Sequence, residues 1–98
     1  MLIVTGSIRA RPDCIDEVLA LGLAHVRRSR QEPGCLLHSV HHDVEDPLRL
    51  VFLEHWVDAD ALREHFRVPE SGAFVNAATA LAATPPELTI YEAHAVSL

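Results

Sequence analysis

The chain has 98 residues, of which 49% are hydrophobic, and a formal net charge of −6 at pH 7. This composition excludes a disordered chain, and the length predicts a single domain over residues 1–98 with one modest core. The acidic balance argues against nucleic acid as a partner, and no apolar run approaches the roughly 18 residues of a membrane helix.

The first segment, residues 1–9, is rich in β-branched residues and is predicted to be a strand. Because the chain opens with a strand and not with a basic and then apolar leader, we expect no export and a cytoplasmic location. The two cysteines, Cys14 and Cys35, match no metal spacing and are expected to be free thiols there.

Apolar residues at helical spacing predict a helix over residues 15–30, entered through Pro12 and Asp13. Gly22 lies on its apolar stripe and allows either close packing or room for a ligand. The basic cluster Arg27, Arg28 and Arg30 is interpreted as a solvated helix end that meets the helix dipole, and not as an anion site.

Two further strands are predicted over residues 35–42 and 48–57, joined by the polar turn 43–47 into an antiparallel hairpin. Strict alternation in the first of them puts Leu36, His38, Val40 and His42 on one face. A helix over 59–66, capped by Asp58 or Asp60, is interrupted by Pro69 and resumes over about 71–83.

A last strand over residues 88–96 completes the order β-α-β-β-α-β, which is the split βαβ motif of ferredoxin-like α+β domains with an antiparallel sheet. Several strands are apolar on both faces. The helices cover only one face, so we expect a homodimer through the other.

Several short motifs follow one another along the chain in a characteristic order. Glu32-Pro33-Gly34-Cys35-Leu36 precedes a strand, and Leu53 to Asp58 carries the pattern E-x-W-x-D; the pieces that follow are Ala61-Leu62, His65, Pro69 and Phe74. Over nearly its whole length the chain resembles the antibiotic biosynthesis monooxygenase domain family. The resemblance implies a dimeric α/β barrel of two ferredoxin-like subunits, each with a pocket between sheet and helices.

Members of this family oxidise quinols or aromatic polyketides without metal or flavin, degrade haem, or act as isomerases or degraders of small signalling molecules. The resemblance therefore favours a monooxygenase with no cofactor and no metal, acting on a small quinol-like, phenol-like or polyketide-like aromatic molecule. The alternative is a small-molecule binding protein, an isomerase or a signal-degrading enzyme on the same scaffold.

By position, His65 and Trp56 match the family's catalytic residues, His65 as a proton acceptor and Trp56 as a ring or N–H against the substrate. Each has a plainer interpretation, a helix-end histidine and a core tryptophan. The remaining candidates for substrate binding are His25, His38, Phe52, Phe66 and Phe74. His25 also suits the flank of a helix, and His38 a partly buried histidine with one hydrogen bond.

Departures from the family pattern narrow the range of reactions expected for this chain. Polyketide oxygenases carry an asparagine where this chain has Phe52, so a hydrogen-bond donor for a developing oxyanion is missing. The segment Phe74–Ala78 contains no histidine to ligate haem, and haem cleavage is disfavoured. Glu70 stands where many members have a histidine.

Overall fold

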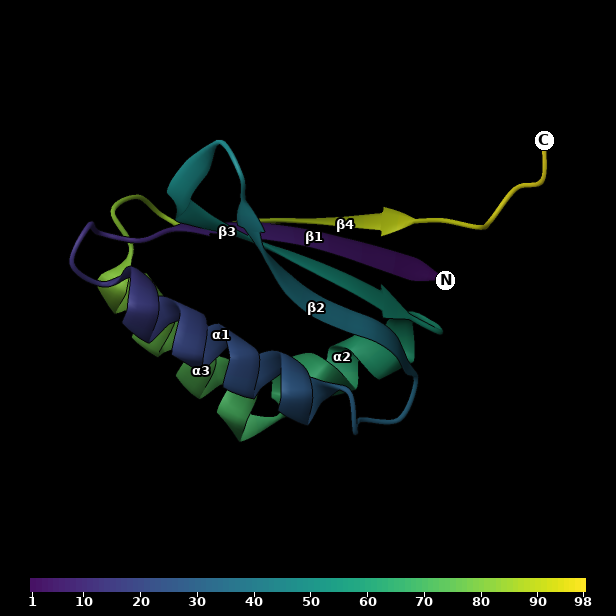
Figure 1. Ribbon diagram of the computed structural model, residues 1–98. Coiled ribbons are helices and arrows are strands. Elements are labelled where there is room, and N and C mark those ends of the chain that lie inside the picture. Colours follow the sequence, from purple (N-terminus) through teal and green to yellow (C-terminus); the bar gives the residue numbers. More distant parts are fainter.

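The computed structural model describes residues 1–98 as one four-stranded sheet with three helices on one side (Figure 1). In chain order the elements are β1 (Leu2–Arg9), α1 (Ile15–Ser29), β2 (Cys35–Asp43), β3 (Asp46–Trp56), α2 (Ala59–Arg67), α3 (Pro69–Leu81) and β4 (Glu87–Glu92). The strand order is β2-β3-β1-β4 and every neighbouring pair is antiparallel. The predicted ferredoxin-like fold is therefore confirmed.

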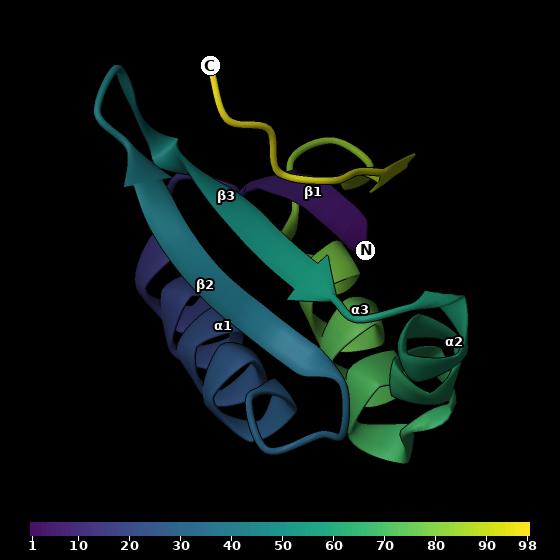
Figure 2. The ribbon, with the colours of Figure 1, turned by 90° about the vertical axis from the view of Figure 1, so that its right-hand side faces the viewer.

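The core lies between the sheet and the helices. Alternate residues of β3, from Leu50 to Trp56, point toward the helices and are buried. The larger cluster joins them to α1 and α3, with the members Ile8, Ala10, Cys14, Val18, Val26, Leu50, Phe52 and Ala78. A smaller cluster of Val4, Trp56 and Leu62 anchors α2. Figure 2 shows α1 beneath β2, with α3 and α2 beside it.

Two positions require glycine, each for a different structural reason. Gly22 approaches the sheet so closely that a Cβ there would lie 3.1 Å from the Phe52 ring. Of the two roles considered for Gly22, close packing and room for a ligand, the structure therefore supports close packing. Gly34 has a φ of +82°, and a Cβ there would lie 2.6 Å from that of Ala61. Only glycine suits this turn between α1 and β2.

The structure corrects several element boundaries. Pro69 does not merely interrupt a helix but begins α3, where its missing N–H costs no hydrogen bond. Asp58, not Asp60, caps α2 by accepting a hydrogen bond from the Ala61 N–H at 2.9 Å. The last strand ends at Glu92, before the predicted end at residue 96.

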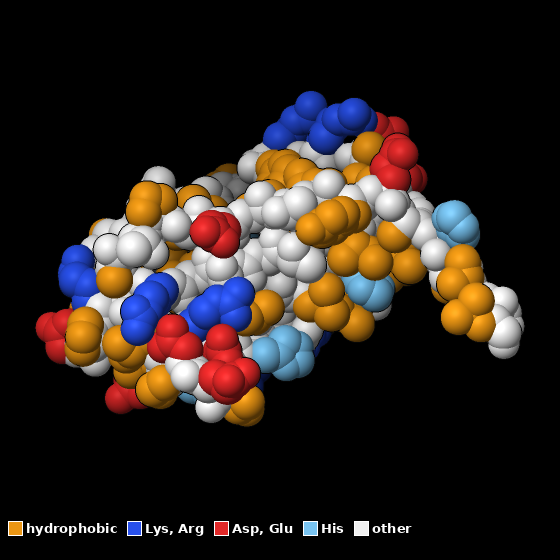
Figure 3. Space-filling model, turned by 90° about the horizontal axis from the view of Figure 1, so that it is seen from above, with side chains coloured by type: hydrophobic (Ala, Val, Ile, Leu, Met, Phe, Trp, Pro, Cys, Tyr) orange, Lys and Arg blue, Asp and Glu red, His pale blue; other side chains and the backbone are white.

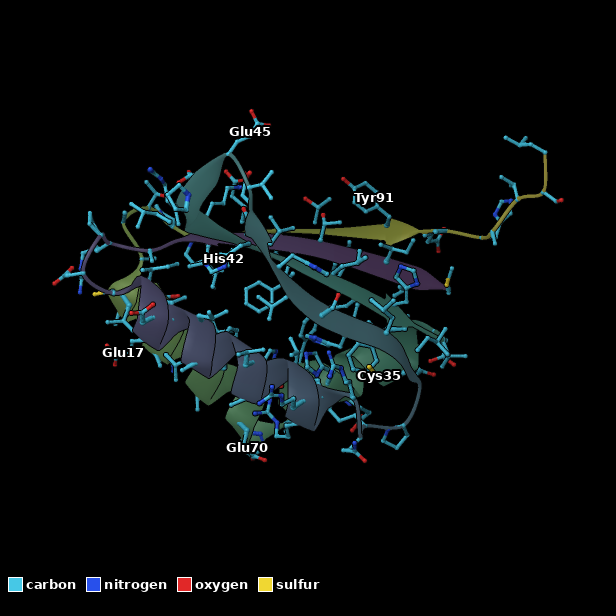
Figure 4. All side chains as sticks on the ribbon, viewed as in Figure 1. Glu17, Cys35, His42, Glu45, Glu70 and Tyr91 are labelled. Atoms are coloured by element: carbon cyan, nitrogen blue, oxygen red, sulfur yellow. The ribbon has the colours of Figure 1, made fainter.

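Strict alternation in β2 is also wrong at its beginning. The register shifts between Cys35 and Leu37, so Cys35 pairs with Trp56 and packs against the inner cluster, whereas Leu36 is 58% exposed. Figure 4 shows Cys35 on the helix side of the sheet near α2. A β-bulge of this kind reorients the residues on either side of it, so only His38 and later residues keep the predicted faces.

The face of the sheet away from the helices, here called the outer face, is bare in the single chain. Pairing registers align Leu37, His55, Ile3 and Tyr91 in one row across all four strands, with Leu53 beside it. Tyr91 stands above the sheet in Figure 4, and Figure 3 shows hydrophobic side chains on this face toward the end where the C-terminal segment leaves. None of the helices has the length and hydropathy needed to cross a bilayer.

Candidate functional site

A cavity of about 480 Å³ lies between the sheet and the helices. Its walls come from β1, β3, α1, α2, α3 and the start of β4. Among the lining side chains are three aromatic ones, Phe52, Phe66 and Phe74. The polar groups that reach it from the buried end are His25, Glu54 and His65. A mostly apolar hollow with a few converging polar groups is typical of a small-molecule site.

His65, on α2, is fixed by a carboxylate from the turn after α1. Its Nδ1 lies 2.8 Å from Oε1 of Glu32, and the imidazole is only 3% exposed. Because a carboxylate can only accept here, the hydrogen is on Nδ1 and the lone pair of a neutral ring is on Nε2. Nε2 makes no hydrogen bond within the protein and lies 3.9 Å from Oε1 of Glu54. His65 is thus oriented as a proton acceptor.

Glu54, on β3, is a buried carboxylate at the base of the cavity. Its Oε1 accepts a hydrogen bond of 2.8 Å from the Trp56 indole N–H and lies 3.3 Å from His38 Nε2. Burial alone would raise the pKa of this carboxyl, but His38 and the indole N–H outweigh burial and hold the pKa below its usual range. A negative charge therefore persists beside His65.

His38, on β2, is buried next to this carboxylate without a well-aligned partner. Nε2 lies 3.3 Å from Oε1 of Glu54, yet neither ring nitrogen forms a hydrogen bond. The ring lies edge-on to Trp56 at 6.1 Å between centroids. His38 packs behind the cavity and does not line it.

His25, on α1, is held from the side opposite to His65. Its Nδ1 accepts a hydrogen bond of 2.9 Å from the Arg28 guanidinium, which also donates to the Ser71 hydroxyl at 3.3 Å. The imidazole stacks on Phe74 with 4.2 Å between centroids and 7° between planes. The prediction that Arg27, Arg28 and Arg30 form a solvated helix end is therefore wrong for Arg28. Arg27 and Arg30 are exposed, as predicted.

The three imidazoles of His25, His38 and His65 form one buried cluster, here called the histidine cluster. A ring nitrogen from each lies within 4.8 Å of one from each of the others, a grouping that could hold a metal ion. Two features oppose a cation. The positive charge of Arg28 lies beside the histidine cluster and repels a metal ion. The hydrogen bond from Arg28 also occupies Nδ1 of His25, which leaves the ring hydrogen on Nε2 and no lone pair for a metal. That no metal binds stays a prediction.

The structure brings together most residues that the sequence singled out. His25, His65, Phe52, Phe66 and Phe74 line the cavity; His38 and Trp56 lie behind it. The indole N–H of Trp56 donates its hydrogen bond to Glu54. Direct contact of Trp56 with a substrate stays a prediction. Sequence reasoning missed the roles of Glu32, Glu54 and Arg28. The available signal was that Glu32 begins the E-P-G-C motif and Glu54 begins the E-x-W-x-D motif.

Comparison with known proteins decides the family. The family model described as antibiotic biosynthesis monooxygenase matches residues 1–77. The chain belongs to this family. An uncharacterized protein of Synechocystis, sll1783, is 35% identical over 91 residues, and the match covers 93% of this chain. The chain spans only 62% of the length of that relative.

Solved structures of the same family share the fold closely. A crystal structure of an antibiotic biosynthesis monooxygenase is 32% identical with a TM-score of 0.89, covering 97% of this chain and all of that one. A proposed antibiotic biosynthesis monooxygenase of Deinococcus radiodurans is 29% identical with a TM-score of 0.94, covering 100% of this chain and 98% of its own. The family resemblance inferred from short motifs is thereby confirmed, and with it a monooxygenase-like fold.

Proposed function

We propose that this chain is a cofactor-independent monooxygenase of a small quinol or phenol-like aromatic molecule. The observation that carries the proposal is the Glu32–His65 pair, which presents a free Nε2 to a cavity walled by Phe52, Phe66 and Phe74. His65 takes the proton of a substrate hydroxyl. The electron-rich anion left in the apolar cavity is the species that reacts with O₂.

The overall reaction balances without a further reductant. A quinol and one O₂ give a hydroxyquinone and one water: the ring loses four electrons, one oxygen atom enters the ring and the other leaves as water. The protein supplies a base, a fixed orientation and exclusion of solvent. Positioning and general-base catalysis together account for large rate effects in enzymes of this type.

The test is oxygen consumption with a panel of quinols, comparing the wild type with His65→Ala. We expect a loss of about 10²–10⁴-fold, the usual contribution of a general base. Equal rates in the two proteins would remove His65 from the reaction. Tight binding of the same quinols without oxygen consumption, followed by the fluorescence of Trp56, the only tryptophan, would favour the binding-protein or isomerase alternative.

The proposal includes assembly and location. The row of apolar and aromatic side chains on the outer face would be buried in a homodimer, which is the assembly that the family resemblance implies. Both cysteines are free, Cys14 buried and Cys35 partly buried, which fits work in the reducing cytoplasm.

A further inference from the structure

His25 and His65 face each other with opposite hydrogen-bonding sense. Arg28 can only donate, so its 2.9 Å hydrogen bond to Nδ1 of His25 puts the hydrogen of the neutral ring on Nε2. Glu32 can only accept, so His65 carries its hydrogen on Nδ1 and its lone pair on Nε2. One ring therefore offers an N–H and the other an acceptor.

The His25 ring stays neutral, as a donor of this kind requires. Burial lowers the pKa of His25 to about 3, and the neighbouring His38, His65 and Arg28 act in the same direction, against the opposing Glu54 carboxylate. These are the charged and titratable groups that face the ring from α1, α2, β2 and β3. The Arg28 cation on Nδ1 also polarises the ring and strengthens the N–H on the far side.

The two rings are close enough to share a single atom. Their centroids are 5.4 Å apart, and a ring nitrogen of one lies within 4.8 Å of a ring nitrogen of the other. An oxygen that makes two hydrogen bonds of about 2.8 Å can bridge nitrogens up to about 5.6 Å apart. Both residues line the cavity, and the hydrogen bonds that hold the two rings within the protein are made through Nδ1 and not through Nε2.

We propose that an acidic hydroxyl of the substrate, a phenol or an enol, binds between His25 and His65, and that His25 holds the oxyanion formed when His65 removes the proton. The O–H bond breaks, its electron pair stays on oxygen and the proton moves to Nε2 of His65. No electron is exchanged in this step. Arg28 is a positioning residue that fixes the tautomer of His25. The inference deepens the proposed function and rests on it for the base.

The arrangement also accounts for a gap noted in the sequence. Phe52 offers no hydrogen-bond donor from β3, and the N–H comes instead from His25 on α1, at another wall of the same cavity. The stacking of His25 on Phe74 holds the donor ring in place and continues the aromatic surface of the cavity. A flat, conjugated substrate with one acidic hydroxyl fits these contacts.

The test measures the preference for an anion directly. p-Nitrophenol is titrated into the protein, and its visible phenolate band gives the affinities of the phenolate and phenol forms. We expect the wild type to favour the phenolate by about tenfold or more, the size of a hydrogen bond to a charged group. His25→Phe, which keeps the stack on Phe74, should lose most of that preference.

Arg28 has its own readout and a matched control. Arg28→Gln should weaken the phenolate preference several-fold while leaving affinity for the neutral phenol unchanged, and Arg28→Lys should restore part of the preference. Arg27→Gln removes the exposed neighbour on the same helix turn and should change nothing. A merely structural role of Arg28 would weaken both forms equally.

Three results would overturn the inference: an unchanged preference in His25→Phe, no binding of p-nitrophenol or related phenols, or tight Zn²⁺ binding by the wild type that His25→Phe abolishes. The last would show that His25 presents a lone pair and not an N–H. Oxygen consumption is measured separately, so phenolate binding without oxidation would reject the proposed function and keep the inference.

Discussion

Oε1 of Glu32 and Nδ1 of His65 lie 2.8 Å apart, although 33 residues separate them in the chain. The turn after α1 and the helix α2 meet only in the folded protein. Because Glu32 fixes which ring nitrogen of His65 is free, this contact turns a buried histidine into an oriented proton acceptor. The carboxylate acts through the imidazole and does not reach the cavity itself.

Replacing Glu32 should therefore weaken His65 as a base without changing the lining of the cavity or the binding of substrate. In Glu32→Gln the amide oxygen can still accept from Nδ1, but the negative charge that stabilises the imidazolium is gone. We expect kcat for quinol oxidation to fall about 10–100-fold with little change in KM. Glu64→Gln, an exposed glutamate on α2, is the control. A rise in KM with kcat unchanged would contradict the assignment.

Removing the indole N–H should cost stability. Trp56→Phe leaves the buried Glu54 carboxylate without its 2.8 Å donor. A hydrogen bond to a charged group is worth about 1.5–3 kcal/mol, and loss of indole packing adds to it. Urea denaturation measures the difference. The double variant Trp56→Phe with Glu54→Gln should lose less than the sum of the two single losses; strict additivity would show that the pair does not interact.

Acid should destabilise the protein at a higher pH than its carboxyls alone would cause. The folded-state pKa of His25, about 3, lies below its ordinary value of 6.5, so the unfolded chain binds a proton that the native state excludes. The resulting stability is present above pH 6.5 and is lost, by up to about 1.4 kcal/mol per pH unit, as pH falls toward 3.

Denaturation curves between pH 7 and 5 test this sign. His25→Phe should flatten the dependence in that range. The lowered pKa of Glu54 contributes in the same direction at more acidic pH, where the unfolded glutamate begins to bind its proton. A wild type whose stability stays constant from pH 7 to 5 would mean that His25 titrates normally.

The turn between α1 and β2 should not tolerate a side chain. Gly34→Ala forces a residue with Cβ into φ +82° and against Ala61 and Val57. We expect a loss of about 2 kcal/mol or more in the free energy of unfolding. Gly72→Ala, where a Cβ would meet nothing within 4 Å, is the matched control and should be neutral or stabilising. Equal effects would remove the conformational argument.

The outer face should carry the dimer. Light scattering is expected to give about twice the 10.8 kDa of one chain. Leu53→Glu puts a charge beside the row formed by Leu37, Ile3 and Tyr91, and should yield monomers. Ala20→Glu, on the exposed side of α1, should leave the mass unchanged. A wild-type monomer at micromolar concentration would reject this interface.

Local patterns along the chain were enough to predict the order of the elements and the fold. Periodicity and turn residues are local signals, so the hairpin around residues 43–47 and the helix break at Pro69 could be read directly. The sequence also placed His25, His65 and three phenylalanines among the candidates. Alternation in β2 failed at Leu36, because a bulge depends on the partner strand and leaves no local pattern.

The chemistry of the histidine cluster depends on contacts that form only when the chain folds. Arg28 looks like any basic residue at a helix end, and Glu32 like part of a turn; each acquires its role from a histidine whose ring it orients. Glu54 sits two residues from Trp56, yet its buried charge follows from the helices that cover it. Hydrogen-bond sense at His25 and His65 is set by partners brought together in space, and the order of residues along the chain does not encode it.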